Sequence, residues 1–298
     1  MVSSRKKAVN KKPLREKQND SPNPLSSLME CADGSAPTKR RDVAALQKEA
    51  SMILLIARRE LRSLFAMPST WFILAILQFI FAWFFLARLE AFLEIQPQLA
   101  QLANPPGVTV TIAAPLFFTA GFLLMMLVPM FTMRLIAEER RNQTLALLLS
   151  SPLSERHIVL GKFFGLMSFL LALTVMLPAI IYTLALGTTL DHGLILSNCI
   201  GLILLTASYV ALGLYVSALT SQPVIAAIGA LAVLIGLWLA DMAATAADSP
   251  WHQLSPLYHF QNFNAGLLDS SDAAFFVLFT AFFLLLTMKR LHNNRVYG

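Results

Sequence analysis

The chain has 298 residues, of which 56% are hydrophobic and 13% charged, and its formal net charge is +6. This balance excludes an ordinary soluble domain and is typical of a polytopic membrane protein. The two cysteines, Cys31 and Cys199, belong to no CxxC motif or Cys/His cluster, which argues against a zinc or redox site.

The first part of the chain is polar. Residues 1–43 are rich in Lys, Arg, Ser, Pro and Asn, which predicts a disordered basic cytoplasmic tail. Residues 44–66 alternate leucines with Arg58, Arg59 and Arg62 and are expected to form an interfacial amphipathic helix. No apolar stretch near the start resembles a signal peptide. We therefore expect a tail at 1–43 followed by a membrane domain at 44–298.

Six apolar runs follow, and they predict an all-α fold with six transmembrane helices. At about 1.5 Å per residue they reach roughly 24 to 39 Å, against a hydrocarbon core of about 30 Å. Of the 23 Lys and Arg residues, all except Arg88 lie before the first run, in the loop after the second run or after the last run. Because basic residues concentrate in cytoplasmic loops, both termini and that loop are expected to be cytoplasmic. Basic loops against an anionic leaflet explain the net charge without nucleic acid. The runs are 70–87, 112–133, 163–186, 194–219, 224–240 and 273–288.

The loop between the second and third runs, from Arg134 to Lys162, has its own pattern. Arg134 and Glu138 are four residues apart, so they could pair on one helical face. Leu145, Leu148 and Leu149 then make an apolar stripe that ends before Pro152, because proline cannot continue a helix. The pattern predicts a small amphipathic hairpin between two membrane helices.

Catalytic motifs are weak in this chain. The sequence lacks GxxxxGK[ST], and Gly161-Lys162 is followed by Phe163, so no phosphate-binding loop is expected. Glu138-Glu139 is similar to the EExxxR pattern of CAAX-type membrane proteases, but residue 143 is Gln where that pattern has Arg. The methionines that crowd the second run could bind Cu(I), although packing between helices is the favoured interpretation.

The segment from Asp241 to Asp272 is rich in aromatic residues, which favour a membrane interface. We expect it to lie along the outer surface as short helices. His252 and His259 are seven residues apart and could share a helix face as metal ligands. Packing or polar contacts are the favoured interpretation for both histidines.

Four stretches carry a resemblance to a known family: residues 57–74, 134–162, 211–228 and 254–272. The second is the most specific, because a charged helix end, a leucine turn, a Ser-Pro break and a Gly-Lys re-entry occur in that order. The chain resembles ABC-2 type transporter permeases, in particular the branch with the gliding-motility permease and the nitrous-oxide-reductase maturation permease.

The resemblance implies a non-catalytic permease subunit of an exporter-type complex in a bacterial cytoplasmic (inner) membrane. ATP and Mg would bind a separate ABC ATPase subunit, and this chain would hold no cofactor. The other implied partners are a second permease chain in a homo- or heterodimer, membrane lipid and an extracytoplasmic accessory protein. The family's ATPase-coupling contact would fall on Glu138, Glu139, Arg140, Thr144, Leu145, Leu148 and Pro152.

Two other functions stay open at the level of sequence. The first is a membrane scaffold or mechanical transmission subunit that links an ATPase to an extracytoplasmic partner. The second is a secondary transporter driven by an ion gradient. Ionisable residues are nearly lacking inside the predicted spans, which weakens the second alternative.

Overall fold

The computed structural model describes residues 36–99, 101, 107–144, 154–243 and 252–297. The chain divides into two units, Met1–Lys48 and Glu49–Gly298. In the first unit the described residues, from Ala36 to Lys48, are helical.

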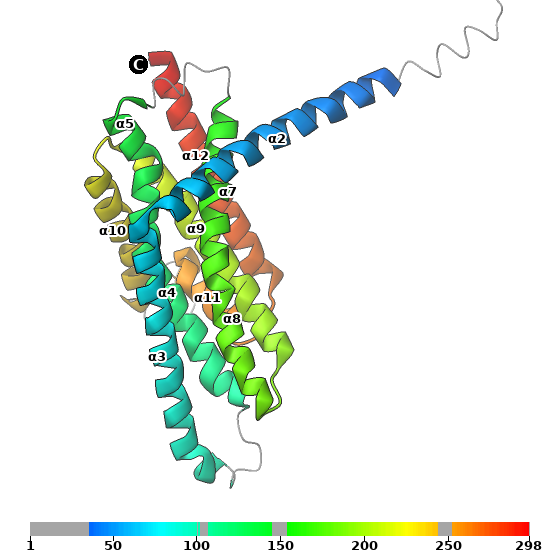
Figure 1. Cartoon of the computed structure of the whole chain (residues 1–298), viewed down its shortest axis with the longest axis vertical. Helices are drawn as coiled ribbons and strands as arrows, with labels where there is room; N and C mark the ends of the chain where they lie inside the picture. Colours follow the sequence, from blue (N-terminus) through cyan, green and yellow to red (C-terminus); the bar gives the residue numbers. More distant parts are fainter. Residues whose placement is uncertain (1–35, 100, 102–106, 145–153, 244–251, 298) are drawn as a thin grey trace, which may run out of the picture. The chain divides into compact units, whose positions relative to one another are not determined.

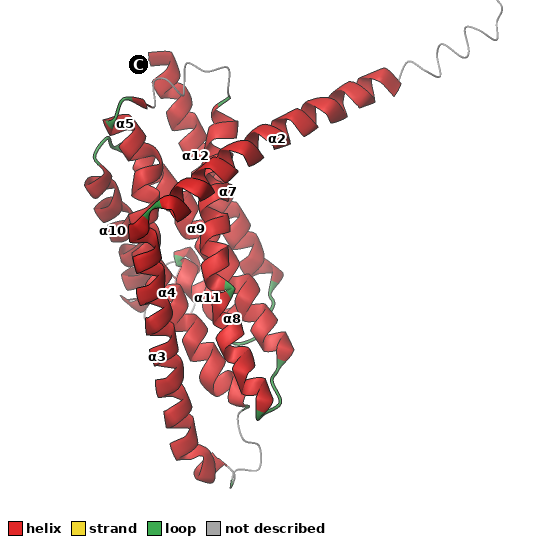
Figure 2. Cartoon of the chain, in the orientation of Figure 1, coloured by secondary structure: helices red, strands yellow, loops and turns green. Residues whose placement is uncertain are grey.

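The described residues form helices and connecting loops without a strand (Figure 2). The expected all-α fold is therefore confirmed. The α-helices are α2 (Ala36–Ala66), α3 (Pro68–Leu99), α4 (Ala114–Met133), α5 (Glu139–Arg141), α7 (Glu155–Thr174), α8 (Met176–Ile181), α9 (His192–Leu219), α10 (Pro223–Ala243), α11 (Pro256–Asn264) and α12 (Ser270–Tyr297). Two π-helical turns, η1 (Thr109–Ala113) and η2 (Arg134–Glu138), flank α4, and the 3-10 turns are η3 (Tyr182–Leu186) and η4 (His252–Leu254).

Six helical stretches are long and apolar enough to cross a membrane, as the sequence predicts. They contain 21 to 33 residues, or about 32 to 50 Å of helix, which exceeds a hydrocarbon core of about 30 Å. Each contains one of the predicted runs and extends it by one or more residues at one or both ends. The stretches are Pro68–Gln98, Thr109–Arg141, Glu155–Leu186, His192–Leu219, Pro223–Ala243 and Ser270–Arg295.

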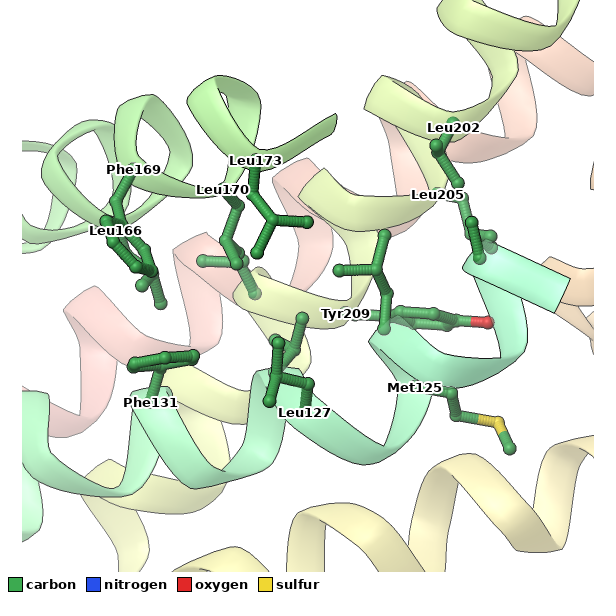
Figure 3. Packing of buried hydrophobic residues seen from close by; sticks show 14 of the residues in the cluster. Met125, Leu127, Phe131, Leu166, Phe169, Leu170, Leu173, Leu202, Leu205 and Tyr209 are labelled. Atoms are coloured by element: carbon green, nitrogen blue, oxygen red, sulfur yellow. The ribbon is translucent and has the colours of Figure 1, made fainter. Parts of the chain in front are cut away.

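Helices α4 and α9 are the most buried of the six. They approach closely at Gly213 of α9, where an added Cβ would collide with the Thr132 side chain of α4. Figure 3 shows Phe131 and Leu127 of α4 facing leucine and phenylalanine side chains of α7, with Tyr209 of α9 beside them. The apolar core therefore lies where α4, α7 and α9 meet.

Helix α11 differs from the sequence-based expectation. Short helices do form in this segment, but Leu257, Phe260 and Phe263 are at most 1% exposed rather than lying at an outer surface. Helix α11 packs against α9 and α4 (Figure 1). Gly201 of α9 permits this contact, since a Cβ there would lie 2.6 Å from Cβ of Phe263.

Candidate functional site

The second long helical stretch changes its winding just beyond Met133. It passes into the π-helical turn η2, and a serine from α9 compensates the altered backbone hydrogen bonding. The N–H of Ala137 donates to Oγ of Ser217 at 3.0 Å, and the same hydroxyl donates to the Met133 carbonyl at 3.3 Å. Such turns leave backbone groups without their regular partners, so a neighbouring hydroxyl stabilises them. Ser217 therefore ties η2 to α9.

Helix α5 continues from η2 and also contacts the end of α9. Nη1 of Arg140 donates to the Ala218 carbonyl at 3.3 Å, and carbonyls in the last turn of a helix lack partners within that helix. Gln143 then adopts a left-handed conformation with φ +58°. A left-handed residue just after a helix is a common way to end it. The hydroxyl of Thr144 donates to the Glu139 carbonyl at 3.2 Å and closes the turn.

Lys162 of α7 lies at the centre of this region and is 2% exposed. Its Nζ donates to Oε1 of Glu60 at 2.8 Å and to Oε1 of Glu139 at 2.7 Å. Because Glu60 belongs to α2 and Glu139 to α5, one ammonium group joins three helices. We call Glu60, Glu139 and Lys162 the ion triad.

The ion triad depends on close packing between α2 and α7. A Cβ on Gly161 would lie 2.6 Å from Cβ of Ile56, and a Cβ on Gly165 would lie 2.8 Å from Cβ of Glu60. The spacing from 161 to 165 is the G-x-x-x-G pattern, which lets membrane helices approach at backbone distance. These two glycines therefore let α2 lie close enough for Glu60 to reach Lys162.

The ion triad is not electrically balanced. Two carboxylates surround one ammonium group, and Oε2 of Glu139 is buried without a hydrogen-bond partner among the described residues. Removing one member of a fully buried ion pair typically costs about 3 to 5 kcal/mol, because the remaining charge is uncompensated, and the cost here is smaller because Glu60 and Glu139 are 18% and 26% exposed. A cleft of about 240 Å³ opens beside the triad and is also lined by Arg59, Ser63, Arg134, Glu138, Asn142 and Thr144.

Two further grooves connect this region with the turn between α9 and α10. The larger, of about 590 Å³, lies between Arg140, Arg141 and Gln143 on one side and residues 221–224 on the other. The smaller, of about 440 Å³, is lined by Arg134, Glu138 and Arg141 among others. Helix α12 ends nearby, since Nη1 of Arg295 donates to Oε1 of Glu155 at 2.9 Å (Figure 1). The grooves and these helix ends form one polar face of the second unit.

The structure brings only part of the predicted coupling contact together. Glu139 and Arg140 are half-buried and hold α5 to α7 and α9, while Glu138 and Thr144 are exposed. The pairing considered for Glu138 with Arg134 is not among the described ion pairs, and the Arg134 guanidinium donates to Sδ of Met67 instead. Leu145, Leu148 and Pro152 lie outside the described residues.

Sequence reasoning missed the residues that position this site. Glu60, Lys162 and Ser217 were not singled out, although a lysine directly before an apolar run is a visible signal. The structure starts α7 at Glu155, so Lys162 lies about two turns inside the helix and directly before the apolar run. The G-x-x-x-G spacing at Gly161 could also have indicated a helix contact.

The fold and this site define a multi-pass membrane subunit whose polar face lies at one end of its apolar helices. The model of the ABC-2 family transporter protein matches residues 54–291, and the chain belongs to that family. A search of curated proteins finds no matching sequence.

Family membership determines the general function. The chain is a membrane permease component of an ABC-2 transporter, a transmembrane domain without ATPase activity. An ABC-2 permease works with an ATPase subunit, so such a partner is implied. Because ABC-2 transporters use ATP, membership of this family argues against the alternative of a secondary transporter driven by an ion gradient.

Proposed function

We propose that the segment from Arg134 to Lys162 is the surface on which the ATPase partner docks, and that the ion triad transmits the partner's movement to the membrane helices. The observation that carries the proposal is the position of Lys162, which is buried between Glu60 of α2 and Glu139 of α5. A displacement of α5 would therefore act on α7 and α2 together.

Rigid connections support this role. Domain movements are passed on by packed elements with discrete arrangements rather than by loose loops. On the proposed docking side, α5 is held by Ser217 through η2, by Ala218 through Arg140, and by Lys162 through Glu139. Glu138 and Thr144 are exposed and are available to the ATPase, as we propose for Leu145, Leu148 and Pro152.

The finer assignments follow from charge and from the resemblance to the gliding-motility and nitrous-oxide-reductase maturation branch. We place both termini and the docking segment in the cytoplasm of a bacterium, with the chain in its inner membrane. ATP and Mg bind the ATPase subunit, and two permease chains form the membrane part of the complex. Binding of an extracytoplasmic accessory protein would favour the alternative in which this permease acts as a mechanical scaffold. In that case the rate of ATP hydrolysis should depend on the accessory protein.

A double substitution tests the docking surface. Leu145→Asp with Leu148→Asp should abolish co-purification with the ATPase, because each buried leucine contributes about 1.5 to 3 kcal/mol. The pair would then weaken the interface by about two or more orders of magnitude. The matched control is Leu267→Asp with Leu268→Asp, two leucines that are 62% and 61% exposed and lie outside both the docking segment and the six apolar stretches. Recovery of the ATPase at wild-type yield with the first double variant would refute the docking assignment.

A further inference from the structure

Two imidazole–carboxylate contacts hold the segment around α11. Nδ1 of His252 lies 2.6 Å from Oδ1 of Asp241 at the end of α10. Nδ1 of His259 lies 2.6 Å from Oδ1 of Asp272 at the start of α12. Both carboxylates are buried, with Asp241 8% and Asp272 3% exposed. The segment is therefore tied to the helix before it and to the helix after it.

His259 differs from His252 because both of its ring nitrogens face oxygen atoms. Nε2 lies 3.0 Å from the Gln253 carbonyl, which can only accept, so this nitrogen carries a hydrogen. A neutral imidazole has a single N–H, and Nδ1 would then direct a lone pair at Asp272. The other carboxylate oxygen, Oδ2, already accepts from Nδ2 of Asn262 at 2.8 Å. The 2.6 Å contact therefore needs one additional proton, whether it resides on Nδ1 or on Oδ1.

The surroundings of His259 suit a positive charge. The ring stacks on Phe275 with centroids 4.0 Å apart and planes 23° from parallel, and aromatic faces attract cations. Asp272 supplies the compensating negative charge. His252 needs no additional proton. In the described part of the chain only its Nδ1 has a hydrogen-bond partner, and a neutral ring satisfies that contact.

Few other ionisable groups approach this pair. The Tyr258 ring centroid lies 5.7 Å from that of His259 and 5.2 Å from that of His252, whose partner is Asp241. Helix α4 contains no ionisable side chain, and α9 meets the end of α11 through Ser197, whose hydroxyl donates to the Phe263 carbonyl. The further ionisable residues of α9, which have no recorded contact with His259, are His192, Cys199, Tyr209 and Tyr215.

The His259–Asp272 contact holds a helix that packs against α4 and α9. Phe260 of α11 lies against Gly121 of α4, and Phe263 lies against Gly201 of α9. The contact is also distant from the proposed docking face. Pro223 lines grooves beside Arg140 and Arg141, whereas Asp241 is 18 residues, or about 27 Å, farther along α10.

We propose that the His259–Asp272 pair is a proton-binding site that latches α11 against α4 and α9. With the proton bound, Nδ1 and Oδ1 share a hydrogen bond and α11 is held. As the pH rises and the proton leaves, a lone pair and a carboxylate oxygen face each other and the latch loosens. The site responds to the pH at this end of the protein and does not depend on the proposed docking of an ATPase.

Spin labels test the latch in the full-length protein in lipid nanodiscs. Labels at Leu267→Cys and Leu196→Cys, with Cys31 and Cys199 replaced, report the position of the α11 segment against α9 by electron–electron distance measurement. Both leucines are exposed, at 62% and 60%. We expect a narrow distance distribution at pH 6 that broadens at pH 8.5. Distributions that superimpose at the two pH values would overturn the proposal.

Two variants assign the response to one histidine. His259→Gln cannot gain a charge, so its distribution should be the same at pH 6 and pH 8.5. His252→Gln is the matched control and should retain the wild-type response, whereas loss of the response in this variant would contradict the assignment. Nitrogen-15 spectra of the unaltered protein give a check that needs no variant. At pH 6 they should show either both ring nitrogens of His259 protonated, or Nε2 alone protonated with Nδ1 accepting from a protonated Asp272, and a neutral ring protonated at Nδ1 alone would refute the site.

Discussion

Nζ of Lys162 lies 2.7 Å from Oε1 of Glu139, which places the start of α5 directly on the side of α7. The same ammonium group also reaches Glu60 of α2. Since a buried ammonium group is stable only with compensating partners, the three helices are bound to one another by charge as well as by packing.

Replacing the lysine should destabilise the permease more than its loss of packing explains. Lys162→Met retains most of the side-chain volume but leaves Glu60 and Glu139 without the ammonium group that bonds both of them. The expected cost is below the about 3 to 5 kcal/mol of a fully buried pair, because both carboxylates are partly exposed. It should appear as a lower thermal midpoint of the detergent-purified protein. The matched control is Lys289→Met on α12, an exposed lysine whose replacement should change the midpoint little.

Neutralising the whole triad should restore stability. In Glu60→Gln with Glu139→Gln and Lys162→Met no charge remains in the ion triad, and such replacements are often neutral or stabilising. The triple variant should therefore unfold at a temperature near that of the unaltered protein. A triple variant as unstable as Lys162→Met would show that the cost comes from packing rather than charge.

The close approach of α2 and α7 should not tolerate a methyl group. In Gly165→Ala the new Cβ would lie 2.8 Å from Cβ of Glu60 and 3.0 Å from the Ala57 carbonyl, so the helices must separate. Overpacking of this kind costs about 1 to 3 kcal/mol. Gly236→Ala on α10 is the control, because nothing lies within 4 Å of its added Cβ. There the higher helix propensity of alanine should stabilise the protein by up to about 1 kcal/mol. Equal effects of the two substitutions in thermal unfolding would contradict the packing described.

Replacing Ser217, the α9 serine that bonds η2, should destabilise the local structure more than replacing another buried serine. Ser217→Ala leaves the Ala137 N–H without its acceptor, and a buried donor left unsatisfied costs about 1 to 3 kcal/mol. Ser208→Ala is the control, because the Ser208 hydroxyl donates only to the Leu205 carbonyl of its own helix. Hydrogen exchange around residues 134–141 should increase in the first variant and stay unchanged in the second. Unchanged exchange in both would show that η2 does not need this hydroxyl.

Thiol labelling tests the proposed orientation. In a background without Cys31 and Cys199, Gln143→Cys should react with a membrane-impermeant reagent only from the cytoplasmic side. Thr188→Cys, which follows η3 and is also exposed, should react only from outside. This expectation follows from the distribution of Lys and Arg. Labelling of residue 143 from outside would reverse the orientation.

The sequence was sufficient for the six apolar helices and the family, because long hydrophobic runs have few alternative structures in a membrane. It also directed attention to the polar segment that begins at Arg134. The contacts between helices at this segment could not be predicted from the sequence. Ser217 and Glu60 look ordinary in the sequence, and their roles appear only when α9 and α2 are placed beside η2 and α7.

The buried position of α11 was not predictable for a similar reason. Its aromatic residues are equally typical of a membrane interface and of a packed helix. The packed position is possible because Gly201 of α9 has no side chain, which leaves room for Phe263. The two residues are more than 60 positions apart, so the sequence does not show that they meet. The hydrogen-bond partners of His259 likewise become visible only when α12 and η4 are in place.

The most direct test of the central claim compares ATP hydrolysis with helix movement in the triple variant. The complex with its ATPase is reconstituted in nanodiscs, with spin labels at Leu93→Cys of α3 and Leu239→Cys of α10, both exposed. In the unaltered complex, ATP and Mg should change the distance between the labels. With Glu60→Gln, Glu139→Gln and Lys162→Met the complex should assemble and hydrolyse ATP, while the distance change is lost or strongly reduced. A distance change of wild-type size in this variant would show that the ion triad does not transmit the movement.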